Sequence, residues 1–490
     1  MSASPSALVI GSGFGGLALA IRLQSAGIAT TVIEARDRPG GRAYVWKRDG
    51  YTFDAGPTVI TDPACLEELW ALSGSNMADD VTLMPVNPFY QLLWGDGTKF
   101  DYSNDEAALN AEIARLDPAD VAGYARFLEY SRSVYGEGYV KLGAVPFLRF
   151  SSMIRAAPAL MKHQAWRSVY GLVAGFVRND KLRQALSFHT LLVGGNPMNT
   201  SSIYALIHHL EKTGGVWFAQ GGTNALVNAM VALFRRLGGT LILGDAVNRI
   251  THRGRKVAGV VTASGRRLGA DMIASNGDLV HGYGLIDGSP YAARRVRALK
   301  RKRFSPSLFV VHFGLNGAAP QVAHHSILFS DRYGPLLDDI YRRGKLADDP
   351  SLYLHHPSAT DPSMAPPGKS AFYALAPVPH LGKAPLNWSV EGPRYRDIVL
   401  NRVRQLLIPD LHERLECCFH YTPADFQTDL GAHLGSAFSL EPLLTQSAWF
   451  RAHNRDDHFT NFYFVGAGTH PGAGIPGVVG SAKATASLMI

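Results

Sequence analysis

The sequence contains little cysteine, with three residues in 490, at Cys65, Cys417 and Cys418. No CxxC pair occurs and adjacent cysteines rarely bond each other without strain, so neither a disulfide framework nor a thiolate zinc site is predicted. The residues before the first apolar run, at 7–10, carry no positively charged segment of the kind that secretory signals have. Together these features favour a reduced, cytoplasmic protein.

Charged residues are also scarce, at 18% of the chain, compared with about 25% in typical soluble proteins. Hydrophobic residues make up 46%, which excludes a mainly disordered chain and leaves apolar surface for a cavity or a membrane contact. The longest mid-chain stretch without Asp, Glu, Lys or Arg, residues 184–210, contains Asn196, Pro197 and three histidines, and so is a poor membrane span. We therefore expect any membrane contact to be peripheral.

The net charge of +8 and a pI of about 9.3 favour anionic partners. Nucleic acid is not expected among them, because the sequence has no zinc-finger spacing, no RNP aromatic motif and no long Lys/Arg run. Phosphate groups and anionic lipids remain.

The N-terminal segment has the pattern of a strand, a glycine-rich turn, a helix and a second strand. An apolar run at residues 7–10, helical spacing at 17–24 and a β-branched run at 31–33 predict a parallel βαβ unit. The turn fits GxGxxG and consists of Gly11, Ser12, Gly13, Phe14, Gly15 and Gly16. Its glycines allow a tight turn, a close approach of backbone to a pyrophosphate, and contact between helix and strand. Glu34, 18 residues after Gly16, stands where an acidic residue accepts ribose hydroxyls, so a dinucleotide site is predicted.

The residues that follow indicate which dinucleotide binds. Residues 34–42 match ExxxRxGGR, and here the chain resembles the flavoprotein superfamily of amine oxidases, protoporphyrinogen oxidase and carotenoid desaturases. The resemblance implies FAD, with the loop of Gly41 and Arg42 along its diphosphate. The alternative is that this loop is merely solvated. Further cofactor contacts implied by the resemblance are Ala35, Arg36, Gly56 and Pro57.

Two distant segments support FAD. The resemblance implies that Val247 pairs its backbone with the adenine. It also implies that a glycine-rich segment near the C-terminus places a helix N-terminus beside the isoalloxazine ring, where the helix dipole stabilises the reduced flavin. The contacts implied in this segment are Gly466, Ala467, Gly474 and Val478. Because many flavoproteins have an acidic residue where Ala467 stands, no carboxylate bond to the ribityl chain is expected.

Further blocks narrow the resemblance to bacterial-type phytoene desaturases. They lie at residues 165–170, 187–197, 435–442 and 465–483, and the resemblance covers residues 7–488. It implies FAD-dependent desaturation of phytoene to neurosporene or lycopene in carotenoid biosynthesis, with a quinone or oxygen as electron acceptor. A hydrophobic carotenoid substrate has no polar group for the protein to bind, so its binding must come from burial in an apolar tunnel.

The predicted fold class is α/β, with a Rossmann-like FAD-binding domain made of discontinuous segments, a mixed-sheet substrate domain and a helical cap. The length of 490 residues supports a division, because single cores stop growing at roughly 250–300 residues. The predicted FAD-binding segments are 1–100, 213–285 and 456–490. The predicted cap, facing substrate and membrane, is 101–212, and the substrate domain is 286–455.

The candidate catalytic residue is Arg155, which matches an arginine often found in the cap of the resembled family. Some relatives have an acidic residue at the position of Ser152, so a mechanism that needs that carboxylate is in doubt. The alternative for Arg155 is a solvated or lipid-facing cation. Residues 142–178 mix apolar, aromatic and basic side chains, as a membrane-surface segment or a buried cap helix would.

Pairs of adjacent histidines occur at residues 208–209, 324–325 and 355–356. Neighbouring side chains point to different faces of a helix or strand, so each pair chelates poorly and no metal site is predicted.

Three functions remain open at this point. They are a phytoene desaturase, another flavoenzyme such as a later-step carotenoid desaturase, a carotenoid isomerase or an amine oxidase, and a non-catalytic lipid binder with a flavoprotein fold. The intact glycine turn and the Gly-Gly-Arg loop argue against the binder.

Overall fold

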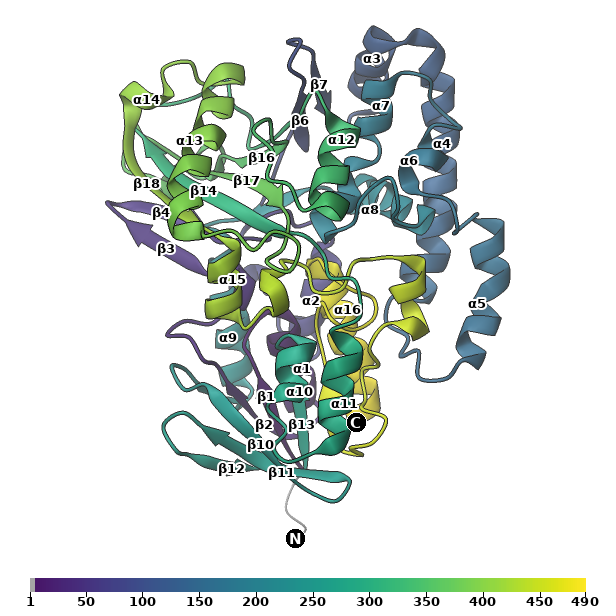
Figure 1. Cartoon of the computed structure of the whole chain (residues 1–490), viewed down its shortest axis with the longest axis vertical. Coiled ribbons are helices and arrows are strands. Elements are labelled where there is room, and N and C mark those ends of the chain that lie inside the picture. Colours follow the sequence, from purple (N-terminus) through teal and green to yellow (C-terminus); the bar gives the residue numbers. More distant parts are fainter. Residues whose placement is uncertain (1–4) are drawn as a thin grey trace.

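The computed structural model describes residues 5–490; residues 1–4, which form part of the stretch inspected for a secretory signal, lie outside the described part. Figure 1 shows a parallel sheet with its helices at the bottom, a mixed sheet at the upper left, and a set of helices on the right. This arrangement confirms the predicted α/β fold class.

A five-stranded parallel sheet forms the first layer. Its order is β19 (Phe462–Phe464), β13 (Met272–Ser275), β1 (Ser6–Ile10), β2 (Ala29–Ile33) and β9 (Thr240–Ile242). Helix α1 (Phe14–Ser25) follows β1 and packs between α9 (Thr223–Arg236) and α16 (Ile475–Met489). Ten of its twelve residues are buried, because the helix is covered on nearly every side. The strands are short and apolar, as expected for a parallel sheet that is buried.

The chain continues from β1 to a strand on one edge of β1 and later returns to form a strand on the opposite edge. β2 pairs with one edge of β1, while β13, more than 230 residues later, pairs with the other edge. The carboxyl ends of β1 and β13 therefore lie side by side at a switch point of the topology. In open α/β sheets this is where ligands bind.

A seven-stranded mixed sheet forms the second layer. Its order is β18 (Leu415–Tyr421), β14 (Ser307–Leu315), β17 (Ser370–Val378), β16 (Leu352–His355), β15 (His325–Leu328), β6 (Tyr90–Leu93) and β7 (Lys99–Tyr102). The side chains of β14 alternate between two hydrophobic cores, one on each face of the sheet. Phe309 and Val311 pack toward α13 (Trp388–Leu406), whereas Leu308 and Val310 belong to the core shared with the cap. This period of two is that of a sheet covered on both faces.

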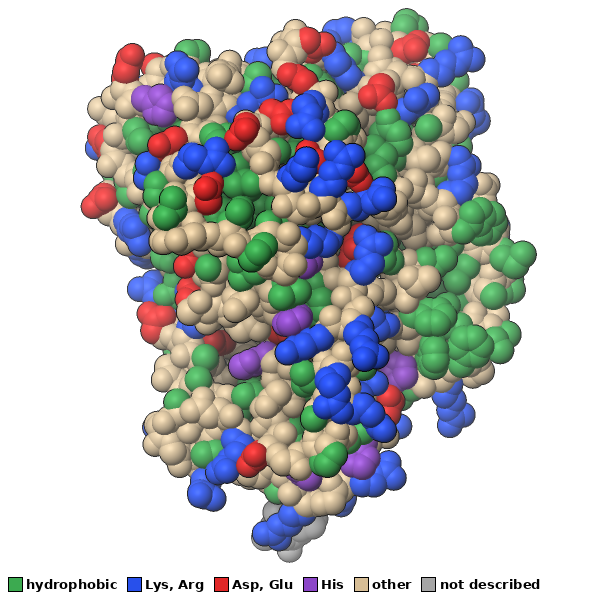
Figure 2. Space-filling view, viewed as in Figure 1, with side chains coloured by type: hydrophobic (Ala, Val, Ile, Leu, Met, Phe, Trp, Pro, Cys, Tyr) green, Lys and Arg blue, Asp and Glu red, His purple; other side chains and the backbone are tan. Residues whose placement is uncertain are grey.

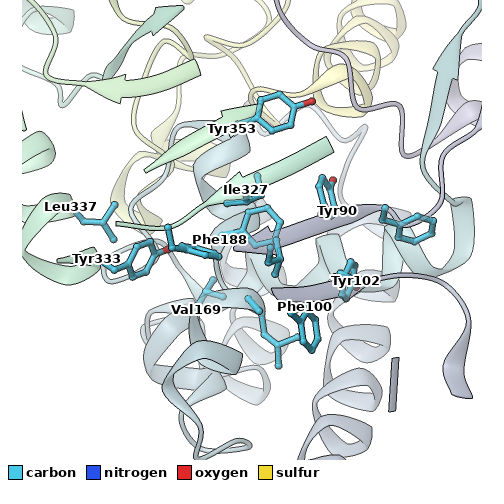
Figure 3. Close-up of a cluster of buried hydrophobic side chains, with 14 of the residues drawn as sticks. Tyr90, Phe100, Tyr102, Val169, Phe188, Ile327, Tyr333, Leu337 and Tyr353 are labelled. Atoms are coloured by element: carbon cyan, nitrogen blue, oxygen red, sulfur yellow. The ribbon is translucent and has the colours of Figure 1, made fainter. Parts of the chain in front are cut away.

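Helices from the middle of the chain cap the second face of the mixed sheet (Figure 1). They are α3 (Glu106–Leu116), α4 (Val121–Tyr135), α5 (Ser151–Lys162), α6 (Val169–Val173), α7 (Asp180–Ala185) and α8 (Leu206–Gly214). Figure 3 shows the core between these helices and the sheet, where Tyr90 and Tyr102 of β6 and β7 lie near Phe188. The aromatic rings of Tyr90 and Phe188 meet edge to face with centroids 5.2 Å apart.

The remaining elements connect these layers. The strands are β3 (Val45–Arg48), β4 (Tyr51–Asp54), β5 (Leu83–Pro85), β8 (Trp217–Ala219), β10 (Val247–Arg253), β11 (Lys256–Thr262) and β12 (Arg267–Gly269). The helices are α2 (Pro63–Ala71), α10 (Leu279–Gly284), α11 (Pro290–Leu299), α12 (Tyr333–Asp338), α14 (Leu411–Arg414) and α15 (Pro423–Leu430). Among residues 5–490, none of the helices combines the length and hydrophobicity needed to cross a bilayer.

The structure corrects one predicted domain boundary. The boundary at residue 100 cuts β7, and β6 and β7 both belong to the mixed sheet, in which β6 runs parallel to β15. Local pattern could not show this, because β6 and β7 form a hairpin whose partner strand lies more than 220 residues away.

Truncating Phe234 on α9 should destabilise the parallel-sheet core. Its side chain is fully buried and lies so close to Gly239 that a Cβ added there would be 2.1 Å from the ring. We expect Phe234→Ala to lower the free energy of unfolding by about 3–5 kcal/mol. The measurement is denaturant unfolding followed by circular dichroism. Leu72→Ala is the matched control, because Leu72 is 43% exposed; an equal loss in both variants would contradict this account of the core.

Candidate cofactor site and apolar cavity

A single cavity of about 830 Å³ connects the glycine turn after β1 with the helical cap. Its walls come from all three parts of the fold. The dinucleotide turn lines one end, the glycine-rich segment before α16 borders the middle, and apolar cap residues such as Leu192 and Leu206 line the other end. The enclosed volume is in the range of cofactor and ligand sites.

The glycine turn is packed too closely for side chains. A Cβ on Gly16 would lie 2.1 Å from the carbonyl oxygen of Gly11, and one on Gly15 would lie 3.1 Å from the Cα of Gly466. Gly11 also has a φ of 96°, a left-handed conformation that favours glycine. The turn thus brings backbone N–H groups at the start of α1 to the cavity, which suits an anion.

Asn276, which follows β13, holds the turn from the opposite side. Its backbone N–H donates to the carbonyl of Ile10 at 2.8 Å. Its side chain lies against the glycines, because a Cβ on Gly13 would be 2.9 Å from Nδ2 and one on Gly466 would be 2.6 Å from Oδ1. Sequence analysis missed Asn276, which directly follows β13 at the switch point.

Glu34 directly follows β2, with its carboxylate buried at the cavity wall. Oε2 accepts from the backbone N–H and the hydroxyl of Ser12 at 2.8 and 2.7 Å, and Oε1 accepts from the N–H of Arg36 at 3.0 Å. A carboxylate has about four acceptor positions, so one remains for a ribose hydroxyl.

Arg42 is a partly buried cation whose buried Nε is an unfilled donor. Burial lowers its pKa, and its only side-chain hydrogen bond among residues 5–490 is a long one of 3.4 Å, from Nη2 to the carbonyl of Ser436. Its Nε has no partner among the described residues. A partly buried guanidinium in this state suits an anionic partner, and the diphosphate of a dinucleotide supplies one.

The C-terminal segment returns to the turn through two left-handed glycines. Gly466 has a φ of 100° and Gly474 a φ of 95°, and α16 begins at Ile475 directly after the second. The carbonyl of Ala467 accepts from Nη2 of Arg451 at 2.6 Å, so the segment is held in place by a buried arginine. The N-terminus of α16 therefore faces the cavity, which its first residues line.

The structure gathers most of the predicted cofactor residues around this cavity. Those that line it are Gly11, Gly13, Phe14, Gly15, Glu34, Ala35, Gly41, Arg42, Gly56, Pro57, Val247, Ala467, Gly474 and Val478. Ser12, Gly16, Arg36 and Gly466 support the wall without lining it. Of these, Arg36 stacks on the ring of Tyr44 at 3.6 Å and pairs with Asp429 at 3.7 Å.

Arg155 does not lie at the cavity. It is on the exposed face of α5, where its one side-chain hydrogen bond is to the hydroxyl of Ser152 at 3.4 Å. Arg155 itself is not among the lining residues, and its catalytic role stays a prediction. Helical spacing alone could not tell which face of α5 turns inward.

Two of the histidine pairs meet in the interior. His324, His325 and His355 are buried together, with one ring nitrogen of each within 4.8 Å of the others. The argument from adjacent side chains was incomplete, because the third imidazole comes from the neighbouring strand β16.

The cavity end beside Glu34 and Arg42 fits a flavin dinucleotide, which leads to a test. Glu34→Gln should weaken FAD binding by about 1 kcal/mol, or roughly fivefold, because a charge-assisted hydrogen bond becomes a neutral one. Fluorescence titration of flavin-depleted protein measures the change, and circular dichroism checks the fold. Glu129→Gln is the control, since that side chain is 74% exposed. Unchanged FAD affinity in Glu34→Gln would contradict the assignment.

Comparison with known proteins agrees with this geometry. The chain is 61% identical to a lycopene-forming phytoene desaturase of a Paracoccus species, over 100% of this chain and 98% of the relative. It is 43% identical to a neurosporene-forming phytoene desaturase of Cereibacter sphaeroides, over 98% and 94%. The solved structure of putrescine oxidase has a TM-score of 0.65 over 99% of this chain and 98% of the other, at 15% identity, which shows the fold alone. The sequence model of the flavin-containing amine oxidoreductases matches residues 14–490, and the chain therefore belongs to that family.

Proposed function

We propose that this protein is an FAD-dependent phytoene desaturase that converts phytoene to neurosporene or lycopene in carotenoid biosynthesis. The observation that supports it most directly is the continuous cavity, which joins a dinucleotide cradle to an apolar chamber under the cap. The relatives named as phytoene desaturases match nearly the full chain. An amine substrate would instead call for polar or charged partners in the chamber.

The chamber suits a long hydrocarbon. Its cap-side walls are mostly apolar, with lining residues that include Leu142, Phe147, Leu191, Leu192, Ile203 and Leu206, although His189 and Glu211 also line them. Apolar area removed from water stabilises a bound substrate by about 25 cal/mol per Å². Binding therefore comes from burial, and orientation comes from the shape of the walls.

The few polar groups on the sheet side of the chamber are paired with one another. The hydroxyl of Thr58 lies 2.9 Å from that of Tyr353 and 2.7 Å from that of Tyr373. Burial raises the pKa of both tyrosines, so they stay neutral and do not act as bases at neutral pH.

The reaction removes a hydride and a proton from neighbouring carbons in each step. When bound, FAD supplies the hydride acceptor. The residues of this chain hold the substrate carbons beside the N-terminus of α16 and keep water out of the chamber. The helix N-terminus also stabilises negative charge on a group bound there.

Phytoene supplied in liposomes with FAD should be converted to coloured carotenes, detected by absorbance and chromatography. Leu206→Arg, which places a charge in the apolar wall, should lower the rate roughly tenfold or more with flavin content unchanged. Leu72→Arg is the exposed control. Substrate and FAD binding without any desaturated product from the unaltered protein would contradict the proposal.

We further propose that α5 docks on a membrane surface. Four large apolar side chains are exposed on and beside it: Phe150 at 52%, Ile154 at 63%, Met161 at 67% and Trp166 at 65%. Figure 2 shows this apolar group at the right-hand edge, where Figure 1 places α5. The exposed cations Arg149, Arg155 and Lys162 flank the group and suit anionic lipid headgroups.

The inner face of the same helix lines the chamber. Met153, Ala156, Ala159 and Leu160 of α5 belong to the cavity wall. One helix therefore separates the proposed lipid surface from the substrate chamber, which gives a lipid-soluble substrate a short route. A quinone in the bilayer or dissolved oxygen would serve as the electron acceptor on this proposal.

The double variant Ile154→Asp with Trp166→Asp should release the protein from liposomes. Removing two inserted side chains, each contributing about 1.5 kcal/mol or more, lowers the bound fraction at least tenfold. Flotation with phosphatidylglycerol-containing vesicles measures it. Val390→Asp is the matched control, because Val390 is 65% exposed on α13, far from α5 in Figure 1. Equal flotation of the double variant and the control would exclude α5 as the docking surface.

A further inference from the structure

Three imidazoles meet in the interior of the mixed sheet, at a place that the proposed reaction does not use. His325 is on β15, His324 directly precedes it, and His355 is at the end of the adjacent strand β16. His325 and His355 are 0% exposed and His324 is 5% exposed. One ring nitrogen of each lies within 4.8 Å of the others.

The nitrogens that face this point lack hydrogen-bond partners. Nε2 of His324, Nε2 of His325 and both ring nitrogens of His355 have no partner within residues 5–490. Asp54 adds a fourth unfilled group, because its buried Oδ2 also has no hydrogen-bond partner there and lies 3.9 Å from Nε2 of His355. Buried polar atoms in folded proteins are nearly always paired, so a group of this size indicates a missing ligand.

The opposite nitrogens of two of the rings are held in place. Nδ1 of His324 lies 2.6 Å from the hydroxyl of Thr360, and Nδ1 of His325 lies 2.7 Å from the hydroxyl of Tyr353. Metal-ligating histidines characteristically bond a second residue through the nitrogen that does not bind the metal. These contacts orient both Nε2 atoms toward the common point.

We propose that His324, His325 and His355, with Asp54 beside them, form a binding site for a divalent transition-metal ion of the zinc class. Imidazole with one carboxylate is a common donor set for zinc. In tetrahedral zinc sites ligand nitrogens are about 3.4 Å apart, given a zinc–nitrogen distance of about 2.1 Å. The ion would therefore draw the three rings closer together than they stand here.

The site joins elements that the cofactor and the substrate both need. Asp54 ends β4, its Oδ1 accepts from the N–H of Thr223 at the start of α9 at 2.9 Å, and the chain continues from it into the cavity wall at Gly56 and Pro57. His325 and His355 belong to the sheet beneath the chamber. A metal here acts as a structural clamp between the dinucleotide domain and the mixed sheet, without taking part in redox chemistry.

The test is the metal content of tag-free, flavin-loaded protein, which is independent of desaturation. After incubation with Zn²⁺ and removal of free ion, mass spectrometry should find close to one zinc per chain. Co²⁺ should give visible bands of a tetrahedral site at wavelengths beyond the flavin absorption. His355→Asn and His325→Asn should each lower retained metal at least tenfold. His412→Asn is the control, because that histidine is exposed on α14.

Metal retention that stays unchanged in both variants, or no retained metal in the unaltered protein, would overturn the proposal. A crystal structure that shows water at the common point after Zn²⁺ soaking would do so as well. If His355→Asn fails to fold, the unaltered protein provides a second test. Removing the ion with a chelator should lower the melting temperature of the protein, and adding Zn²⁺ should restore it. If the unaltered protein retains the metal but does not desaturate phytoene, that result would contradict the proposed function and leave the metal site standing.

Discussion

The close approach of three backbone segments at Gly11–Gly16, Asn276 and Gly466 is the constraint on which the site depends. Side chains on Gly15 or Gly16 would collide with neighbouring atoms, at distances that real side chains do not reach. Because the glycines leave that space free, β1, β13 and the C-terminal segment meet at one point. The N-termini of α1 and α16 consequently face one cavity, and a single cofactor can lie against both.

The cap helices form the apolar end of the cavity. The mixed sheet has an apolar face on each side: α13 covers one, and the cap helices cover the other only in part, so the chamber lies between cap and sheet. Helix α5 has apolar side chains on both of its faces, one toward the chamber and one toward solvent. The exposed apolar face is the one that the proposed lipid surface would cover.

Buried polar groups divide into two kinds in this protein. Some form closed networks, such as the hydroxyls of Thr469 and Ser481, which lie 2.7 Å apart and both accept from the side-chain amide of Asn454. Others, including Arg42 and the three central histidines, have donors or acceptors without partners among the described residues. Since an unpaired buried polar atom is destabilising, the groups of this kind that cluster at Arg42 and at the three histidines are the places where we propose ligands.

The sequence by itself determined the dinucleotide turn, the acidic residue after it and the apolar character of the chain. These features depend on local backbone freedom and on spacing within about 40 residues, as in Gly11, Gly16 and Glu34. The family and the cofactor followed from the same short motifs. Only the tertiary structure decided that β6 and β7 join the mixed sheet, that Arg155 faces outward, that Asn276 supports the turn and that three histidines converge. Each of these depends on contacts between segments distant in sequence, and the packing of whole layers, rather than any local pattern, determines which of them meet.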